Sequence, residues 1–138
     1  MVISKKSSNP KCNLVSEGSS VQPRYMDITG DRDLVCSTSD NTIARVQVDT
    51  DTVVFHNSVL QIKKPWGVDV ASDGSILVTD RSNNTLHLVS SQGAWTKQLW
   101  SVPRDRDKDD KLWIVSTDER MCVCVTEKGS VYIFVCLD

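Results

Sequence analysis

Residues 65–93, PWGVDVASDGSILVTDRSNNTLHLVSSQG, decide the fold because weaker copies of this stretch lie on both sides of it. On the N-terminal side, residues 23–28 align with residues 65–70 at a shift of 42 positions. Residues 34–46, LVCSTSDNTIARV, align with LVTDRSNNTLHLV of the central stretch at a shift of 43. The central stretch is therefore one unit of a repeat.

A third unit follows the central one. Residues 112–129, LWIVSTDERMCVCVTEKG, align without a gap with residues 76–93 at a shift of 36. Short strands of alternating apolar and polar residues that recur in units of about 40 residues are typical of β-propellers, in which each unit forms a four-stranded blade. The sequence thus predicts an all-β partial propeller of about three four-stranded antiparallel blades, with units at about 21–62, 63–100 and 101–138.

Turn residues divide the first two units into strands. In the central unit, Asp73 and Gly74 favour a tight hairpin, and the polar loop 80–84, DRSNN, contains side chains that tolerate left-handed backbone. The expected strands are 67–71, 75–79, 85–90 and 94–100 in the central unit, and 25–29, 33–37, 42–48 and a split segment at 52–62 in the first.

The last unit is less regular. Its strands are expected at 111–115, 121–126 and 131–137, as the second, third and fourth of the blade. Residues 103–111, PRDRDKDDK, are nearly all charged, which indicates a solvated loop. The first strand of this unit is therefore expected at 99–102 or is missing.

The ends of the array are expected to be open. Residues 1–20, rich in Ser, Lys and Asn, resemble a disordered lead-in or the remnant of a preceding blade. Propellers close with about four to eight blades, so three would leave an apolar face at each end. We therefore expect the chain to be a piece of a larger propeller, a truncated product, or a protein that self-associates to cover its open blade edges.

Composition narrows the class of protein. The 138 residues include 39% hydrophobic and 25% charged, enough for an ordered core. A formal charge of −2 gives no overall attraction to nucleic acid. No apolar run approaches the roughly 18 to 20 residues that span a bilayer, and the N-terminus lacks the apolar segment of a secretory signal. We expect a cytoplasmic protein without membrane association.

The cysteines are predicted to be structural. An odd count of five, spread over expected strands, is more typical of reduced buried thiols than of a disulfide framework. Cys122 and Cys124 alternate along one strand and align with Leu86 and Leu88, so they should share an apolar face. A zinc site would need further ligands, and no Cys-x-x-Cys motif is present. Neither a metal nor a cofactor is expected.

The order of residues in the central unit resembles the NHL repeat. The flanking units match it less well, because Tyr25 stands where Gly67 is found and Arg32 where Gly74 is found. With both flanks included, the resemblance extends over about residues 21–138. The matching residues are Pro65, Gly67, Val68, Val70, Asp73, Gly74, Ile76, Val78, Asp80, Asn83, Asn84, Leu86 and Gly93.

This resemblance implies a context and a role. NHL repeats most often form six-bladed propellers, and many lie at the C-terminal end of tripartite-motif (TRIM-NHL) proteins. There they recruit protein substrates or RNA for a RING-type ubiquitin ligase. The chain has no Cys/His-rich RING or B-box motif and no heptad repeat, so ligase activity cannot be assigned to its residues.

A binding surface is predicted on the face formed by the loops that enter each first strand and the loops between second and third strands. Arginine and tryptophan are enriched at binding hot spots. A solvated rim, with Trp66 packed under its neighbouring blade, is the alternative for any single residue. The candidate binding residues are Arg24, Trp66, Arg81, Asn83, Arg104 and Arg120, with Ser39, Asp40 and Glu119 beside them.

Catalytic chemistry has little support in the sequence. Asp69, Asp73 and Asp80 could suggest the metal site of lactonase-type propellers, but a turn or strand position explains each. Neither His56 nor His87 lies in a nucleophile motif. The predicted function is a non-enzymatic protein-interaction module. An RNA-binding surface is one alternative, weakened by the acidic neighbours, and a metal-dependent hydrolase is the other.

Overall fold

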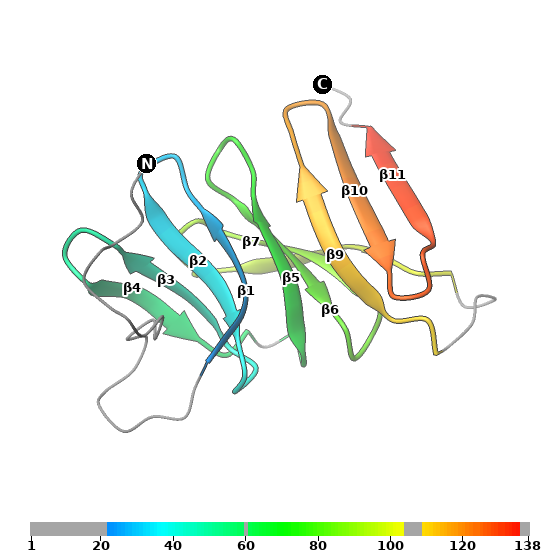
Figure 1. Cartoon of the computed structure of the whole chain (residues 1–138), viewed down its shortest axis with the longest axis horizontal. Coiled ribbons are helices and arrows are strands. Elements are labelled where there is room, and N and C mark those ends of the chain that lie inside the picture. The colour runs from blue at the N-terminus through cyan, green and yellow to red at the C-terminus, as the bar shows by residue number, and fades with distance from the viewer. Residues whose placement is uncertain (1–21, 60, 104–108, 136–138) are drawn as a thin grey trace.

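The structure is a computed structural model that describes residues 22–59, 61–103 and 109–135. All regular elements in these residues are β-strands, arranged in three antiparallel sheets (Figure 1). This confirms the predicted all-β partial propeller. Among the described residues, no helix is long and apolar enough to cross a membrane.

The first two sheets are four-stranded blades. Each has its strands in chain order, as expected from hairpins joined by short turns. Blade 1 comprises β1 (Pro23–Ile28), β2 (Asp33–Thr38), β3 (Ile43–Gln47) and β4 (Thr52–Asn57), and blade 2 comprises β5 (Pro65–Val70), β6 (Ile76–Asp80), β7 (Thr85–Val89) and β8 (Thr96–Ser101). The predicted strands of both units are therefore present, with bounds that differ by a few residues.

The third sheet, blade 3, differs from the expected arrangement. Its described strands are β9 (Leu112–Thr117), β10 (Met121–Thr126) and β11 (Val131–Val135), in the order β11-β10-β9. Figure 1 shows β9 beside β5, just as β5 lies beside β1, so β9 is the inner strand of its blade. The expectation that this segment is the second strand is wrong, and so is the proposed inner strand at 99–102, which overlaps the outer strand β8.

Two apolar layers hold the blades together. Between blades 1 and 2, Val35 and Ile43 pack against Val68, Ile76 and Val78, and all five are buried. Between blades 2 and 3, the buried cluster consists of Leu77, Leu86, Leu112, Val115, Cys122 and Cys124. The core therefore lies between the blades, and blade 2 contributes one of its faces to each layer.

Cys122 and Cys124 have the predicted environment. Both thiols are buried on the face of β10 that packs against blade 2. Trp100 of β8 covers the same layer, with its ring tilted against that of Tyr132 at a centroid distance of 4.7 Å and edge-on to that of Phe134 at 5.0 Å. Their predicted place on an apolar strand face is confirmed.

Hydrogen bonds repeat at both seams between blades. Ser37 Oγ donates to the carbonyl oxygen of Trp66, and Thr79 Oγ1 donates to that of Trp113 at 2.9 Å. On the inner strands, the carboxylate of Asp27 accepts from the amide of Val70 at 2.9 Å, and Asp69 accepts from the amide of Thr117. We call these four contacts the seam bonds; they fix each inner strand against the next.

The charged stretch before β9 is not wholly a solvated loop. Residues 104–108 lie outside the described part, but Asp110 is buried. Its carboxylate accepts from Thr126 Oγ1 at 2.6 Å and from the amide of Lys128 at 2.7 Å. Asp110 therefore ties the entry into β9 to the turn after β10. The predicted lead-in at 1–20 also lies outside the described residues.

Candidate functional site

A tryptophan surrounded by cations marks the face where chain segments enter the inner strands. Trp66, in β5, is half-buried. The guanidinium carbons of Arg24 and Arg81 lie 4.8 Å from its ring, and the ammonium of Lys64 lies 5.5 Å from it. We call these four residues the Trp66 cluster. Cations within about 6 Å of an indole face are attracted to its ring electrons.

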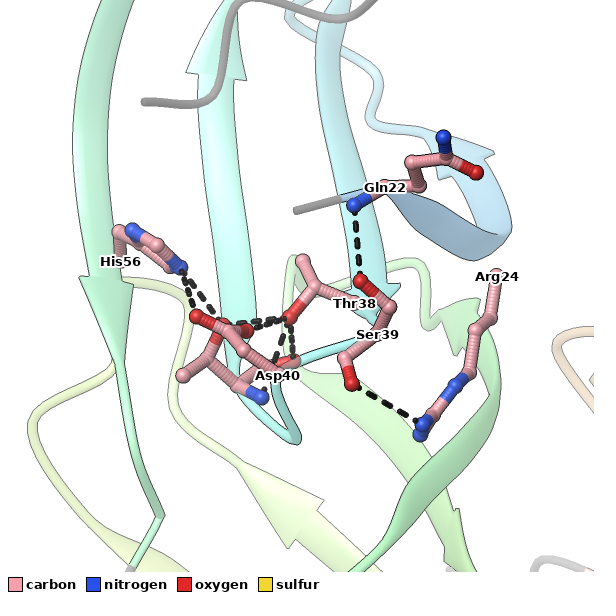
Figure 2. Close-up of polar contacts among 7 residues, drawn as sticks. Gln22, Arg24, Thr38, Ser39, Asp40 and His56 are labelled. Carbon is pink, nitrogen blue, oxygen red and sulfur yellow. Dashed lines mark hydrogen bonds and ion pairs between the residues drawn. The ribbon is translucent and has the colours of Figure 1, made fainter. Parts of the chain in front are cut away.

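Arg24 connects blade 1 to blade 2 within this cluster. Its Nη1 donates to Asn41 Oδ1 at 3.0 Å and to the carbonyl of Pro65 at 3.2 Å. Its Nη2 donates to the carbonyl of Ser39 at 3.3 Å, as Figure 2 shows. Partial burial lowers the pKa of Arg24, an effect that the nearby Asp40 carboxylate opposes. The guanidinium is thus held in place by the β2–β3 loop.

That loop is itself ordered by a hydroxyl network (Figure 2). Thr42 Oγ1 lies 2.6 Å from Asp40 Oδ1 and 2.6 Å from His56 Nε2, and Thr38 Oγ1 also donates to Asp40. Burial opposes ionisation of Asp40, but the Thr38 and Thr42 bonds outweigh it and lower its pKa.

Arg81 extends the cluster to blade 3. It follows β6 and forms an ion pair with Glu127, which follows β10. The two side chains are 23% and 33% exposed, so the pair remains accessible to a ligand. Trp66 also has a buried indole Nε1 that finds no acceptor among the described residues. The face therefore combines three cations, one aromatic ring and one unsatisfied donor.

The structure brings together three of the six predicted binding residues: Arg24, Trp66 and Arg81. Asn83 is next to them in the β6–β7 loop, where its amide donates to Asp80 at 3.0 Å. Arg104 lies outside the described residues. Arg120 lies in the β9–β10 hairpin, at the opposite end of the sheet, because the third unit starts one strand later than expected.

Two residues of this face, Lys64 and Glu127, were not among the binding residues predicted from the sequence. Lys64 is adjacent to the matched Pro65, so its place at the entry to β5 could have been read from the repeat. The place of Glu127 could not be read from the repeat, because the alignment at a shift of 36 does not bring Glu127 to the position of Arg81. Aligning β10 with β6 instead brings Glu127 to the position of Arg81, 46 residues earlier.

The three aspartates once considered for a metal have separate partners. Asp73 accepts from the amide of Ser75 at 2.9 Å within its turn, and Asp69 makes a seam bond. Asp80 accepts from the amides of Lys63 and Lys64 at 3.0 and 3.1 Å. Within the described ranges, no group of three His, Cys, Asp or Glu side chains is placed to hold a metal ion.

Comparisons with known proteins agree with this architecture. Residues 63–87, which include Lys64, Trp66 and Arg81, match the model of the NHL repeat. A search of curated proteins finds no match to the sequence.

Solved structures with a similar fold are distant in sequence. YCF48 bound to D1 peptide aligns with a TM-score of 0.66 at 15% identity, over 88% of this chain and 39% of that one. Virginiamycin B lyase from Staphylococcus aureus aligns at 0.58 and 12%, over 84% and 42%. The computationally designed Ika8 protein aligns at 0.62 and 12%, over 86% and 35%.

The chain spans less than half the length of each of these structures. At such identities the likeness concerns the fold alone. It supports a β-propeller in which the described residues form three neighbouring blades, with an NHL repeat at the central one.

Proposed function

We propose that the chain is a non-enzymatic binding platform whose Trp66 cluster captures an acidic, extended segment of a protein partner. The observation behind this proposal is the placement of Arg24, Arg81 and Lys64 around one half-buried indole ring. Such a group offers both an apolar surface and charge-assisted donors. Trp and Arg are also the residue types that dominate binding energy at protein interfaces.

The charge balance of the face favours an acidic ligand. Asp40 lies near Arg24 and Glu127 pairs with Arg81, while the buried carboxylate of Asp80 accepts backbone amides, including that of Lys64. The side chain of Lys64 makes no ion pair with a described residue, so it is available to an acidic ligand. A ligand carboxylate could exchange with Glu127 for the Arg81 guanidinium. Since Arg forms paired bonds to a carboxylate, this exchange would give the ligand a fixed orientation.

An independent line of support comes from a structural relative. YCF48 is bound to a peptide in its solved structure, and its fold resembles that of this chain. A propeller of this fold can therefore bind a peptide. For the TRIM-NHL proteins that the sequence resembles, the equivalent role is recruiting a substrate to a ubiquitin ligase, and we extend the proposal to that role.

The test is peptide binding by the 138-residue chain, measured by fluorescence anisotropy. The probe is a fluorescein-labelled peptide of alternating Glu and Ser, and a Lys-Ser peptide is its charge-reversed control. Arg81→Gln should weaken binding of the Glu-Ser peptide by about tenfold or more, as expected for a hot spot. The matched control is Arg120→Gln, which removes the same charge from the exposed β9–β10 hairpin.

Equal losses in the two variants would contradict the proposal, because binding would then follow net charge alone. Absence of binding to the Glu-Ser peptide would contradict it as well.

RNA is the second candidate, since guanidinium groups and a Trp ring also provide a stacking platform for bases. A labelled oligouridine added to the same assay decides between them. Tighter binding of oligouridine than of the peptide, with a steep decline as salt rises, would assign the face to RNA.

A further inference from the structure

The guanidinium of Arg81 is already engaged by a carboxylate of the chain itself. Arg81 follows β6 in blade 2, and its ion-pair partner Glu127 follows β10 in blade 3. Both side chains remain partly exposed. Ion pairs that water reaches are weak, because water solvates the separated charges and the paired side chains lose rotamer freedom. The Arg81–Glu127 pair can therefore open at little cost.

The backbone around Glu127 is held at three points. Its own amide donates to the carbonyl oxygen of Lys111 at 2.9 Å. On either side of it, Thr126 Oγ1 and the amide of Lys128 donate to the buried carboxylate of Asp110, at 2.6 and 2.7 Å. Opening of the ion pair therefore needs only a rotation of the Glu127 side chain, which leaves the turn after β10 in place.

Lys64 is the neighbouring cation. The amide of Arg81 donates to the carbonyl oxygen of Lys64 at 3.0 Å, so the two residues are adjacent at the end of the β5–β6 pair. Their charged groups lie 4.8 and 5.5 Å from the Trp66 ring. The Lys64 side chain makes no ion pair with a described residue, and the carboxylate of Asp80 beside it is occupied by backbone amides. A carboxylate that binds Lys64 is therefore within reach of Arg81.

We propose that Glu127 is a built-in competitor of the acidic ligand, so that blade 3 holds the Trp66 cluster in a partly inhibited state. An acidic segment binds Lys64 first, and it gains Arg81 when a second carboxylate of the segment displaces that of Glu127. One carboxylate then replaces another, so part of the free energy of ligand binding is offset by the loss of the resident pair. This inference rests on the function proposed for the cluster.

The competitor and the cations that bind the ligand belong to different blades. Lys64 and Arg81 flank strands of blade 2, whereas Glu127 begins the turn after β10 in blade 3. The position of that turn depends on Asp110 at the entry to β9. The affinity of the cluster is therefore coupled to how blade 3 packs against blade 2, since a displaced turn would release Arg81.

The test applies the anisotropy assay with the fluorescein-labelled Glu-Ser peptide to Glu127→Gln. Removal of the competitor should tighten binding by about two- to fivefold, the range expected for a partly exposed ion pair. The matched control is Glu119→Gln, which removes the same charge. Glu119 lies with Arg120 in the β9–β10 hairpin, at the opposite end of the sheet, so this variant should leave the affinity unchanged.

A second variant separates direct contact from net charge. Glu127→Asp retains the carboxylate but shortens the side chain by one methylene, which weakens its contact with Arg81. Binding of the peptide should therefore tighten in this variant as well, although the charge of the chain is unaltered. Circular dichroism melting of each variant checks that the blades remain folded.

Three results would overturn the inference: an affinity of Glu127→Gln no higher than that of the wild type, equal tightening in Glu119→Gln, or wild-type affinity in Glu127→Asp. Each leaves the proposed function in place if Arg81→Gln still weakens binding more than Arg120→Gln does. Binding by neither the wild type nor Glu127→Gln would overturn both proposals. Binding by Glu127→Gln alone would support the inference, because Glu127 would then be what excludes the peptide from the wild type.

Discussion

Gly67 is the residue at which blades 2 and 3 approach most closely among the described glycines. A Cβ at this position would lie 2.5 Å from the carbonyl oxygen of Trp113 and 3.1 Å from Ile114 Cα. Both are backbone atoms, so neither can swing aside. The glycine of the NHL-like pattern is therefore explained by packing between blades, not by the backbone conformation of the strand.

Gly67→Ala should consequently force the inner strands apart. We expect a loss of about 1–3 kcal/mol in the free energy of unfolding, the usual cost of overpacking. Urea denaturation measures it. Gly30→Ala serves as the control, because a Cβ at Gly30 meets nothing within 4 Å. If both variants unfold at the same urea concentration, the close approach of the two strands is not a constraint.

Asp69 gives the fold a specific dependence on pH. Burial, together with a hydrogen bond to Asp27, raises its pKa to about 6 from an ordinary value of 3.8. The folded chain therefore holds this proton more tightly than the unfolded chain. Its stabilising contribution is complete below about pH 4 and is lost as the pH rises through about 6.

Asp69→Asn should remove this part of the pH profile, since the amide does not titrate. We expect the difference in melting temperature between wild type and variant to change between pH 4 and 7, with the wild type losing stability relative to the variant. Thermal melts across this range provide the measurement. A difference that stays constant with pH would show that Asp69 titrates normally.

The paired thiols of β10 offer a third test at the residue scale. Cys122→Ser combined with Cys124→Ser places two hydroxyls in the apolar layer against blade 2, which should lower the melting temperature. Metal analysis of the wild-type protein accompanies the melts. About one zinc per chain in that analysis would contradict the structural role.

At the scale of elements, the turns that enter and leave a blade depend on buried carboxylates. The side chain of Asp80 is fully buried and accepts from the amides of Lys63, Lys64 and Ser82. It thereby joins the end of β6 to the entry into β5. In blade 3 the carboxylate is on the entry segment instead, as Asp110, and the hydroxyl of Thr126 ends the strand.

Asp80→Asn should therefore cost about 3 kcal/mol, because an amide nitrogen would face buried N–H donors. Asp73→Asn makes the same chemical change at an exposed hairpin turn, where the carboxylate accepts from one amide. We expect that control to change stability by less than about 1 kcal/mol. Guanidinium chloride titrations of both variants would contradict this ranking if the two costs were equal.

The same elements show how far the sequence could be read. The turn at Asp73 and Gly74 fixed the strands of the central blade, and Gly74 has the positive φ of 88° that this turn requires. Arg32, at the corresponding position of the first blade, adopts a φ of 65°. A local turn signal in the sequence was thus sufficient to predict where strands begin and end, because the backbone conformation of a turn depends on a few neighbouring residues.

The predicted third blade was wrong by one strand for the opposite reason. Its strands show the same alternation of apolar and polar residues as any strand of a blade, so the pattern located the strands but did not show which was first, second or third. What orders them is the layer in which Leu112 and Val115 meet Leu77 and Leu86, contacts between segments about 30 residues apart. The same displacement moved Arg120 off the predicted face and concealed Glu127.

At the scale of the whole molecule, the three blades differ in how much of their surface is buried by neighbouring blades. Blade 2 has a neighbour on each side, and all residues of β6 are buried. Blade 3 has one covered face, and three of the five residues of β11 are exposed. In repeat arrays, stability comes from each unit and its interfaces with neighbours.

Hydrogen exchange should therefore be slowest in β6 and β7 and fastest in β11. Mass spectrometry of exchanged peptides from the dilute protein would show this gradient. Uniform protection across the three blades would mean that the array opens as a single unit.

The seam bonds have a direction. At both seams the side chain belongs to the earlier blade and the backbone group to the later one, as with Ser37 and Trp66 or Thr79 and Trp113. Asn84 of blade 2, which accepts from the amide of Leu112, and Arg45 of blade 1, which donates to the carbonyl of Ser91, follow the same order.

Synthesis on the ribosome proceeds in that direction as well, with N-terminal segments able to fold first. Each strand that leaves the ribosome therefore meets side chains already held by the blade before it, and to the seam bonds it contributes backbone groups, which every sequence has. The array can thus assemble in the order of its translation, and the side chains that align a blade are those of its predecessor.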